Sequence, residues 1–253
     1  MRDVDERAAD EGSADAAGAK VGDTISAGNG RWTFGGSVSD TFDAHVAKSV
    51  PLYDTGHDLV AKISDFFLSD GSLCYELGCS TGPLTAALAR RNEDRDVRFV
   101  GVDVVPEMAQ RARDRCSDLP SVTILEADVL DVDLDPSDLV VSYYTIQFVR
   151  PKFRQLLFDR IWQSLNWGGA FLLFEKVRAP DARFQDIATA LYTDYKLDQG
   201  YDAEEIVGKG RSLKGVLEPF STQGNLDLMA RAGFVDIMTI MKYVCFEGFL
   251  AIK

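Results

Sequence analysis

The fold is decided by the stretch Ser72-Leu-Cys-Tyr-Glu-Leu-Gly-Cys-Ser-Thr-Gly82. Its first half is a short apolar run that ends in glycine, which is typical of a buried strand. Residues 81–91 then place Leu84, Ala87 and Leu88 on one face of a helix. A buried strand that turns through glycine into an amphipathic helix is the building unit of a parallel α/β sheet.

Strand and helix patterns continue to alternate after this unit. We expect further strands at residues 97–103, 122–128, 139–144 and 169–176, and helices from Pro106 and over 151–166, 181–198 and 222–231. Two closing strands, 234–241 and 244–253, are joined by a link of about two residues, which allows only an antiparallel hairpin. The pattern predicts an α/β fold with a seven-stranded, mostly parallel sheet, an antiparallel C-terminal hairpin and helices on both faces. This is the pattern of the Rossmann-like class I methyltransferase fold.

The chain is expected to form one folded domain behind a tail. It has 253 residues, 46% of them hydrophobic, which is enough for one substantial core. Residues 1–30 are rich in Ala, Gly, Asp and Glu and have no apolar period, so we expect a disordered acidic tail. The domain would then span residues 31–253, beginning with two helical pieces that break near Pro51.

Composition excludes several classes of function. The formal net charge of -13 disfavours direct nucleic-acid binding, because an acidic surface repels phosphates. There is no apolar run of about 18 residues that could span a membrane, and the N-terminus lacks the pattern of a signal peptide. The four scattered cysteines and two histidines indicate neither a disulfide framework nor a metal site. We therefore expect a cytoplasmic protein that acts on a small molecule without a metal.

The strand ends form a candidate cofactor site, because open α/β sheets bind ligands at the carboxyl ends of their strands. Gly78 and Gly82 let the backbone approach a ligand, and the amides that open the next helix can face a carboxylate. Asp103 ends the next strand, 21 residues after Gly82. An acidic residue at about this spacing accepts hydrogen bonds from ribose hydroxyls. Asp128 ends the third strand and can meet an adenine amino group.

The loop is not a G-x-G-x-x-G phosphate loop, which favours S-adenosylmethionine (SAM) over a dinucleotide. Taken singly, each glycine also fits a tight turn, and each aspartate also fits a helix N-cap or a solvated strand end. Together they predict a SAM site. The residues expected to bind the cofactor are Glu76, Gly78, Cys79, Ser80, Gly82, Asp103, Val104, Asp128, Val129 and Tyr143.

More specific matches run from about Trp32 to the C-terminus. They are the segments 48–53, 75–80, 140–148, 164–169, 174–176, 200–201 and 232–234. In them the chain resembles the carboxy-S-adenosylmethionine synthase family, which supplies a carboxymethyl donor for wobble-uridine modification of tRNA. The resemblance implies that Tyr53 and the loop from Gly78 to Ser80 contact the cofactor, and that residues 31–70 form a helical lid over it. It leaves a monomer and a homodimer open.

The resemblance also implies a reaction that takes a carboxyl carbon from prephenate, with the new carboxylate held by an arginine and an asparagine. Here the chain departs from the family. The asparagine falls on Tyr143, an Asn-Ser pair falls on Val104-Val105, and a Lys-Arg-Ser run falls on Lys209-Gly-Arg211. The arginine is therefore moved to Arg211 or replaced by Gly210. Tyr143, Tyr144 and Arg211 are the candidate catalytic residues, although Arg211 also fits a solvated loop position.

Four functions follow. The leading one is a SAM-dependent enzyme that transfers or rearranges a SAM-derived alkyl group on a small molecule, with S-adenosylhomocysteine or methylthioadenosine as product. A SAM cyclase that makes azetidine-2-carboxylate and a true carboxy-SAM synthase are the alternatives within the enzyme class. The alternative of another class is a non-catalytic SAM-binding scaffold.

Overall fold

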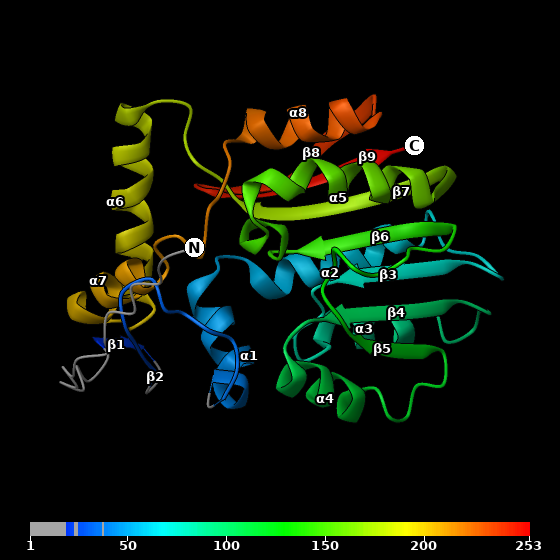
Figure 1. Cartoon of the computed structure of the whole chain (residues 1–253), viewed down its shortest axis with the longest axis horizontal. Coiled ribbons are helices and arrows are strands. Elements are labelled where there is room, and N and C mark those ends of the chain that lie inside the picture. The colour runs from blue at the N-terminus through cyan, green and yellow to red at the C-terminus, as the bar shows by residue number, and fades with distance from the viewer. Residues whose placement is uncertain (1–18, 23–24, 37) are drawn as a thin grey trace, which may run out of the picture.

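The computed structural model describes residues 19–22, 25–36 and 38–253. Its centre is a seven-stranded sheet in the order β5-β4-β3-β6-β7-β9-β8 (Figure 1). The strands are β3 (Leu73–Leu77), β4 (Arg98–Asp103), β5 (Val122–Glu126), β6 (Ser137–Tyr143), β7 (Leu165–Lys176), β8 (Asp236–Tyr243) and β9 (Phe246–Ile252). The strands β3 to β7 are parallel, and β9 is antiparallel to both of its neighbours. This confirms the predicted sheet and its C-terminal hairpin.

The strand order reverses at β3, which pairs with β4 on one side and with β6 on the other. At such a switch point the connections leave the two neighbouring strands in opposite directions, and a crevice opens at their carboxyl ends. The decisive loop, from Gly78 to Gly82, lies at this reversal. The topology therefore places the candidate cofactor loop where an α/β sheet binds ligands.

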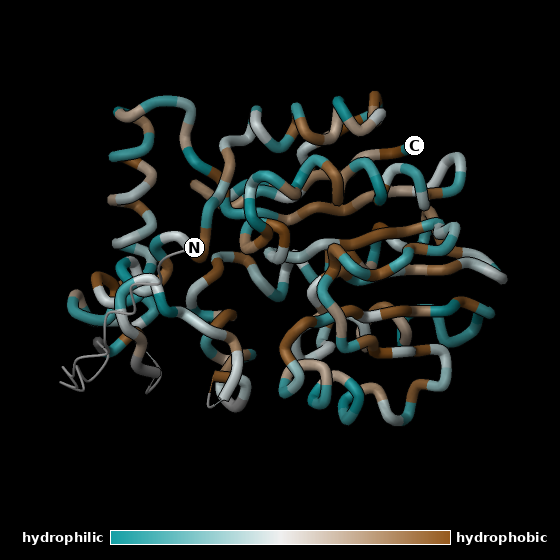
Figure 2. Tube along the Cα trace, viewed as in Figure 1, coloured by the Kyte–Doolittle hydropathy of each residue, from teal (hydrophilic) through white to brown (hydrophobic). Residues whose placement is uncertain are grey.

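Helices cover both faces of the sheet, because alternate strand side chains point to opposite faces. One face packs against α5 (Pro151–Ser164) and α8 (Thr222–Ala232) through Tyr75, Val140 and Phe171. The other packs against α2 (Tyr53–Ser64) and α3 (Pro83–Arg91) through Cys74 and Phe99. The helix α4 (Pro106–Arg115) contacts β4 and β5. Figure 2 shows the strands as the hydrophobic centre between helices with mixed faces.

Three helices lie beyond the carboxyl ends of the strands. They are α1 (Val38–Ser49), α6 (Ala182–Asp198) and α7 (Ala203–Ser212), and Figure 1 shows them on the side to which the arrowheads of the parallel strands point. The helix α7 is missing from the sequence prediction. Gly208 and Gly210 weaken its helical pattern, whereas Asp202 and Glu205 start it with a reciprocal capping box.

The expected tail is wrong for its last residues. Residues 1–18 lie outside the described part of the chain, but β1 (Ala19–Gly22) and β2 (Ile25–Ala27) form an antiparallel pair. Val21 is fully buried in a small cluster with Trp32 and Val38. Val21 and Ile25 are the only large aliphatic residues in the segment 19–27, which is too few to establish a periodicity, so the sequence pattern could not reveal this anchor.

Deleting residues 1–30 is therefore expected to lower the free energy of unfolding by about 2–5 kcal/mol, because it removes a buried aliphatic side chain and leaves a cavity. A chain that lacks only residues 1–18 keeps β1 and is the matched control. Urea unfolding of both proteins measures the difference. Equal unfolding midpoints would show that β1 contributes nothing to stability.

Candidate functional site

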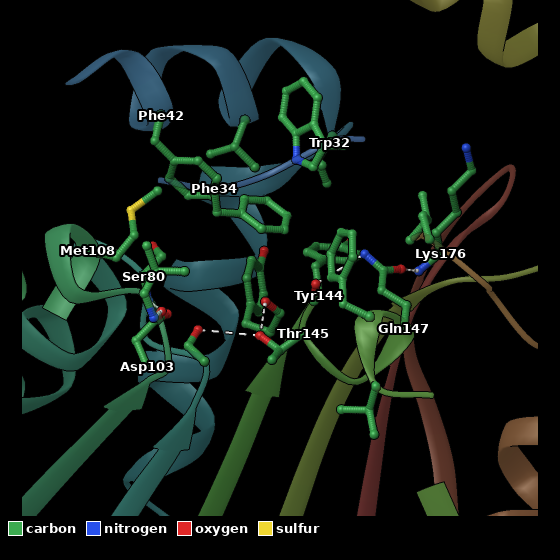
Figure 3. Close-up of a pocket in the computed structure, with 18 of the residues that line it drawn as sticks. Trp32, Phe34, Phe42, Ser80, Asp103, Met108, Tyr144, Thr145, Gln147 and Lys176 are labelled. Carbon is green, nitrogen blue, oxygen red and sulfur yellow. Dashed lines mark hydrogen bonds between the residues drawn. The ribbon is translucent and has the colours of Figure 1, made fainter. Parts of the chain in front are cut away.

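One cavity of about 640 Å³ lies at the carboxyl ends of the strands. Figure 3 shows Asp103 and Ser80 on one side of it, Gln147 and Lys176 on the other, and Tyr144 and Thr145 between them. Trp32, Phe34 and Phe42 lie across from the strand ends. The cavity brings together most of the expected site residues, namely Tyr53, Glu76, Gly78, Cys79, Ser80, Asp103, Val104, Asp128, Val129, Tyr143 and Tyr144.

Two expected residues do not line this cavity. Gly82 has a φ of 78°, and a Cβ there would come within 3.0 Å of Ala112 on α4. The absence of a Cβ lets the start of α3 pack closely against α4, and contact of Gly82 with the cofactor stays a prediction. Arg211 is exposed on α7, and its neighbours Lys209 and Gly210 line the cavity instead. The turn of α7 carries its side chain outward, and its catalytic role stays a prediction.

Gly78 permits a close approach of two loops. Its φ is 84°, and a Cβ on this residue would lie 2.1 Å from Oγ1 of Thr145, which follows β6. Thr145 Oγ1 in turn donates a hydrogen bond to the Gly78 carbonyl at 3.3 Å. Ser80 and Tyr144 also have positive φ, 47° and 58°. Strained backbone thus gathers on both sides of the switch point, as it does at many functional sites.

Asp103 is held rigidly at the end of β4. Its Oδ2 accepts the Ser80 amide at 2.8 Å, and its Oδ1 accepts the Val105 amide at 2.9 Å. Burial raises the pKa of its carboxyl, and backbone hydrogen bonds oppose that shift. Each carboxylate oxygen keeps capacity for a further hydrogen bond, so Asp103 can accept two hydroxyl groups. Asp128 is more exposed and accepts the Leu130 amide at 2.9 Å.

Aromatic rings form the middle of the site. The ring centroid of Tyr143 lies 5.2 Å from that of Tyr53, 4.8 Å from that of Tyr144 and 4.5 Å from that of His57. The Tyr143 hydroxyl donates a 2.6 Å hydrogen bond to the Tyr53 carbonyl. Burial lowers the pKa of His57 to about 4, so this imidazole is neutral at pH 7. The cluster therefore presents ring faces to a ligand, whereas the hydroxyl proton of Tyr143 is already donated to the Tyr53 carbonyl.

Sequence reasoning missed the side of the cavity that lies at the end of β7. Lys176 ends this strand, and Lys196 from α6 reaches the same cavity. Gln147 connects the two neighbouring strand ends, since its side chain donates to the Tyr144 carbonyl and accepts the Lys176 amide. Lysines within amphipathic segments look like surface residues, and only the fold reveals that two of them point inward.

Glu76 is a buried carboxyl at the edge of the cavity. Burial raises its pKa to about 8, although a hydrogen bond donated by Thr85 Oγ1 opposes the shift. Because the folded-state pKa is higher than the ordinary value of 4.5, folding binds a proton between pH 4.5 and about 8. The contribution of Glu76 to stability is therefore lost as the pH rises through this window, with a limiting slope of about 1.4 kcal/mol per pH unit.

Between pH 5 and pH 8 the free energy of unfolding is expected to fall less in Glu76→Gln than in the wild type. The reason is that the glutamine amide cannot ionise. Denaturant unfolding of the ligand-free proteins at a series of pH values measures this. The exposed Glu93→Gln serves as the control. Parallel pH profiles for the Glu76 variant and the wild type would show that Glu76 ionises normally in the folded protein.

The described residues offer neither a membrane-spanning helix nor a metal site. No helix among them is long and apolar enough to cross a membrane. No group of three or more His, Cys, Asp or Glu residues in the same part of the chain is arranged to hold a metal ion.

Comparison with known proteins gives a consistent result. Residues 75–169 match the model of a family described as a methyltransferase domain. The carboxy-S-adenosyl-L-methionine synthase of Staphylococcus epidermidis is 34% identical over 224 residues, which covers 88% of this chain and 97% of that protein. The Sulfurimonas denitrificans enzyme of the same name is 35% identical over 228 residues, 88% of this chain and 95% of that protein.

Solved structures support the fold alone. A Methanococcus maripaludis protein described as an S-adenosyl-L-methionine-dependent methyltransferase superposes with a TM-score of 0.58 at 18% identity. The superposition covers 88% of this chain and 95% of that one.

Proposed function

This chain belongs to the carboxy-S-adenosyl-L-methionine synthase family within the SAM-dependent methyltransferase superfamily, and on that premise we propose that it binds SAM and transfers a SAM-derived alkyl group to a small molecule. The observation that carries the proposal is Asp103. Its carboxylate is fixed by two backbone amides at the end of β4 and lines the cavity at the strand reversal. Among the described cavity residues it is the group best suited to accept two ribose hydroxyls.

The residues present fit SAM. Asp103 accepts hydroxyl donors, the exposed Asp128 can accept an amino group, and three tyrosine rings offer faces that attract positive charge. When bound, SAM supplies an electrophilic carbon on a positively charged sulfur. The chain orients that carbon and excludes water, which are the two requirements for alkyl transfer. Residues 31–70 serve as the lid, since Trp32, Phe42 and Tyr53 line the cavity.

The altered carboxylate site disfavours the synthase reaction. The hydroxyl of Tyr143 already donates to the Tyr53 carbonyl, and Arg211 does not line the cavity. Neither residue is placed to hold a new carboxylate beside the sulfur. SAM cyclisation is the second candidate, because it needs no acceptor and because Tyr53, Tyr143 and Tyr144 line the cavity in which the aminobutyl chain of SAM would fold back on itself.

Incubation with SAM and mass analysis tests whether the chain is an enzyme. Methyl transfer predicts S-adenosylhomocysteine that appears only with an added acceptor, and cyclisation predicts methylthioadenosine without one. Amide exchange over residues 40–53 should slow in the SAM-bound protein if this segment is the lid. SAM that binds and is recovered unchanged with a broad set of acceptors would identify a scaffold instead.

We also propose that the protein is a cytoplasmic homodimer that pairs through α6. Phe184, Ile187 and Leu191 are each about half exposed and recur at helical spacing on this helix. Light scattering at micromolar concentration checks the assembly, and a monomer mass would contradict it.

A further inference from the structure

Three hydrogen-bond donors gather on the side of the cavity that is remote from Asp103. Lys176 ends β7, Tyr144 follows β6, and Lys196 lies in the last turn of α6, where it lines the cavity. All three line the same cavity as Asp103. In the sheet order β4-β3-β6-β7, Asp103 ends β4, whereas Lys176 ends β7. The loop from Gly78 to Gly82 and Tyr143 lie between Asp103 and these donors, and Figure 3 shows Asp103 and Lys176 on opposite sides of the cavity.

These donors are not satisfied by the protein. Within residues 19–22, 25–36 and 38–253, neither lysine ammonium has a hydrogen bond or an ion pair, and both lie over the ring of Tyr192, at 4.1 Å for Lys176 and 4.6 Å for Lys196. The Tyr144 hydroxyl is buried, and it has no hydrogen-bond partner within those ranges either. Tyr144 and Lys196 are only 7% and 9% exposed.

The arrangement is costly unless an anion completes it. Burial lowers the pKa of Lys176, and burial together with the charge of Lys176 lowers the pKa of Lys196 to about 8. No carboxylate within residues 19–22, 25–36 and 38–253 offsets either shift, although the whole chain carries a net charge of -13. Two like charges removed from water without a counter-ion destabilise a fold. An anionic ligand would supply the missing partner.

We propose that Lys176, Lys196 and Tyr144 form an anion subsite that binds the carboxylate of the second small-molecule substrate. This inference rests on the proposed function and deepens it by naming the class of acceptor. The ring of Tyr192 adjoins both ammonium groups, and the ring of Phe246, whose centroid is 5.1 Å from that of Tyr192, adjoins the Lys176 ammonium. They would pack against an apolar or aromatic body. The acceptor is therefore an organic acid with a hydrophobic part, held across the reacting centre from the ribose site.

Calorimetric titration with sodium benzoate, in the presence of saturating S-adenosylhomocysteine, tests the subsite without requiring turnover. Wild-type protein should bind benzoate, and Lys176→Met and Lys196→Met should each weaken that binding at least tenfold. Tyr144→Phe should weaken it about threefold, since a neutral donor contributes less than a charged one. Lys62→Met, which removes an exposed lysine paired with Asp58, is the charge-matched control and should change nothing.

Thermal unfolding separates this role from a structural one. Methionine keeps the length of the side chain and removes the unpaired charge, so both lysine variants should unfold at or above the wild-type temperature without ligand. A large fall in that temperature would mean that the ammonium groups hold the fold together, and it would overturn the subsite.

Titration with SAM and with decarboxylated SAM distinguishes the two sources of a carboxylate. If the lysine variants lose tenfold or more affinity for SAM but bind decarboxylated SAM like the wild type, the subsite holds the carboxylate of SAM itself and the acceptor proposal is wrong. Unchanged SAM affinity with lost benzoate binding supports it. A wild type that binds SAM but not benzoate at millimolar concentration contradicts the subsite alone, whereas a wild type that does not bind SAM contradicts the proposed function.

Discussion

Gly78→Ala is expected to cause the largest loss of any single substitution at the site, lowering both stability and cofactor affinity. A non-glycine residue in the left-handed region costs about 1–2 kcal/mol. The new Cβ would also lie 2.1 Å from Oγ1 and 2.3 Å from Cγ2 of Thr145, so the loop after β6 must move. Overpacking of this kind adds about 1–3 kcal/mol. SAM affinity is expected to fall at least tenfold, about 1.4 kcal/mol, because that loop carries Tyr144.

Gly71→Ala is the matched control, since Gly71 has the same φ of 84° and its Cβ would meet nothing within 4 Å. It should show only the backbone cost and bind SAM normally. Thr145→Gly in the Gly78→Ala background should restore part of the affinity by removing the obstructing side chain. Equal effects of the two glycine substitutions would show that the contact with Thr145 is unimportant.

Asp103→Ala is expected to weaken binding of SAM and of S-adenosylhomocysteine by about 1–3 kcal/mol, the contribution typical of hydrogen bonds to a charged group. Both ligands carry the ribose, so both should lose a similar amount in calorimetry. Asp103→Asn retains one carbonyl acceptor and should lose less. Because Asp103 also accepts the Ser80 and Val105 amides, unfolding of each variant must be measured at the same time. Unchanged affinity in a folded Asp103→Ala protein would remove this residue from the site.

The sheet could be predicted because each strand and helix carries its own periodicity. The apolar run before Gly78 and the strand and helix patterns after it predict the parallel centre of the sheet. The two-residue link between β8 and β9 predicts the antiparallel hairpin. Elements without periodicity were missed. β1 depends on one buried valine, and α7 contains two glycines inside its helical span.

The candidate site could be predicted only where a residue's place on a strand end fixes its direction. Asp103 ends β4 and Asp128 follows β5, and both line the cavity as expected. Gly82 and Arg211 do not line it, because their orientation depends on how α3 packs on α4 and on the turn of α7. Lys196 could not be found from the sequence, since it reaches the cavity only through the tertiary position of α6.

The central claim is that this family member binds SAM but lacks, at Tyr143 and Gly210, the asparagine and arginine that the resemblance places around a new carboxylate beside the sulfur. Incubation of the protein with SAM and prephenate, followed by mass analysis of the nucleoside products, tests it directly. We expect little or no carboxy-S-adenosylmethionine, and instead S-adenosylhomocysteine with an organic-acid acceptor or methylthioadenosine without one. Efficient formation of carboxy-S-adenosylmethionine that is lost in Arg211→Ala would contradict the account.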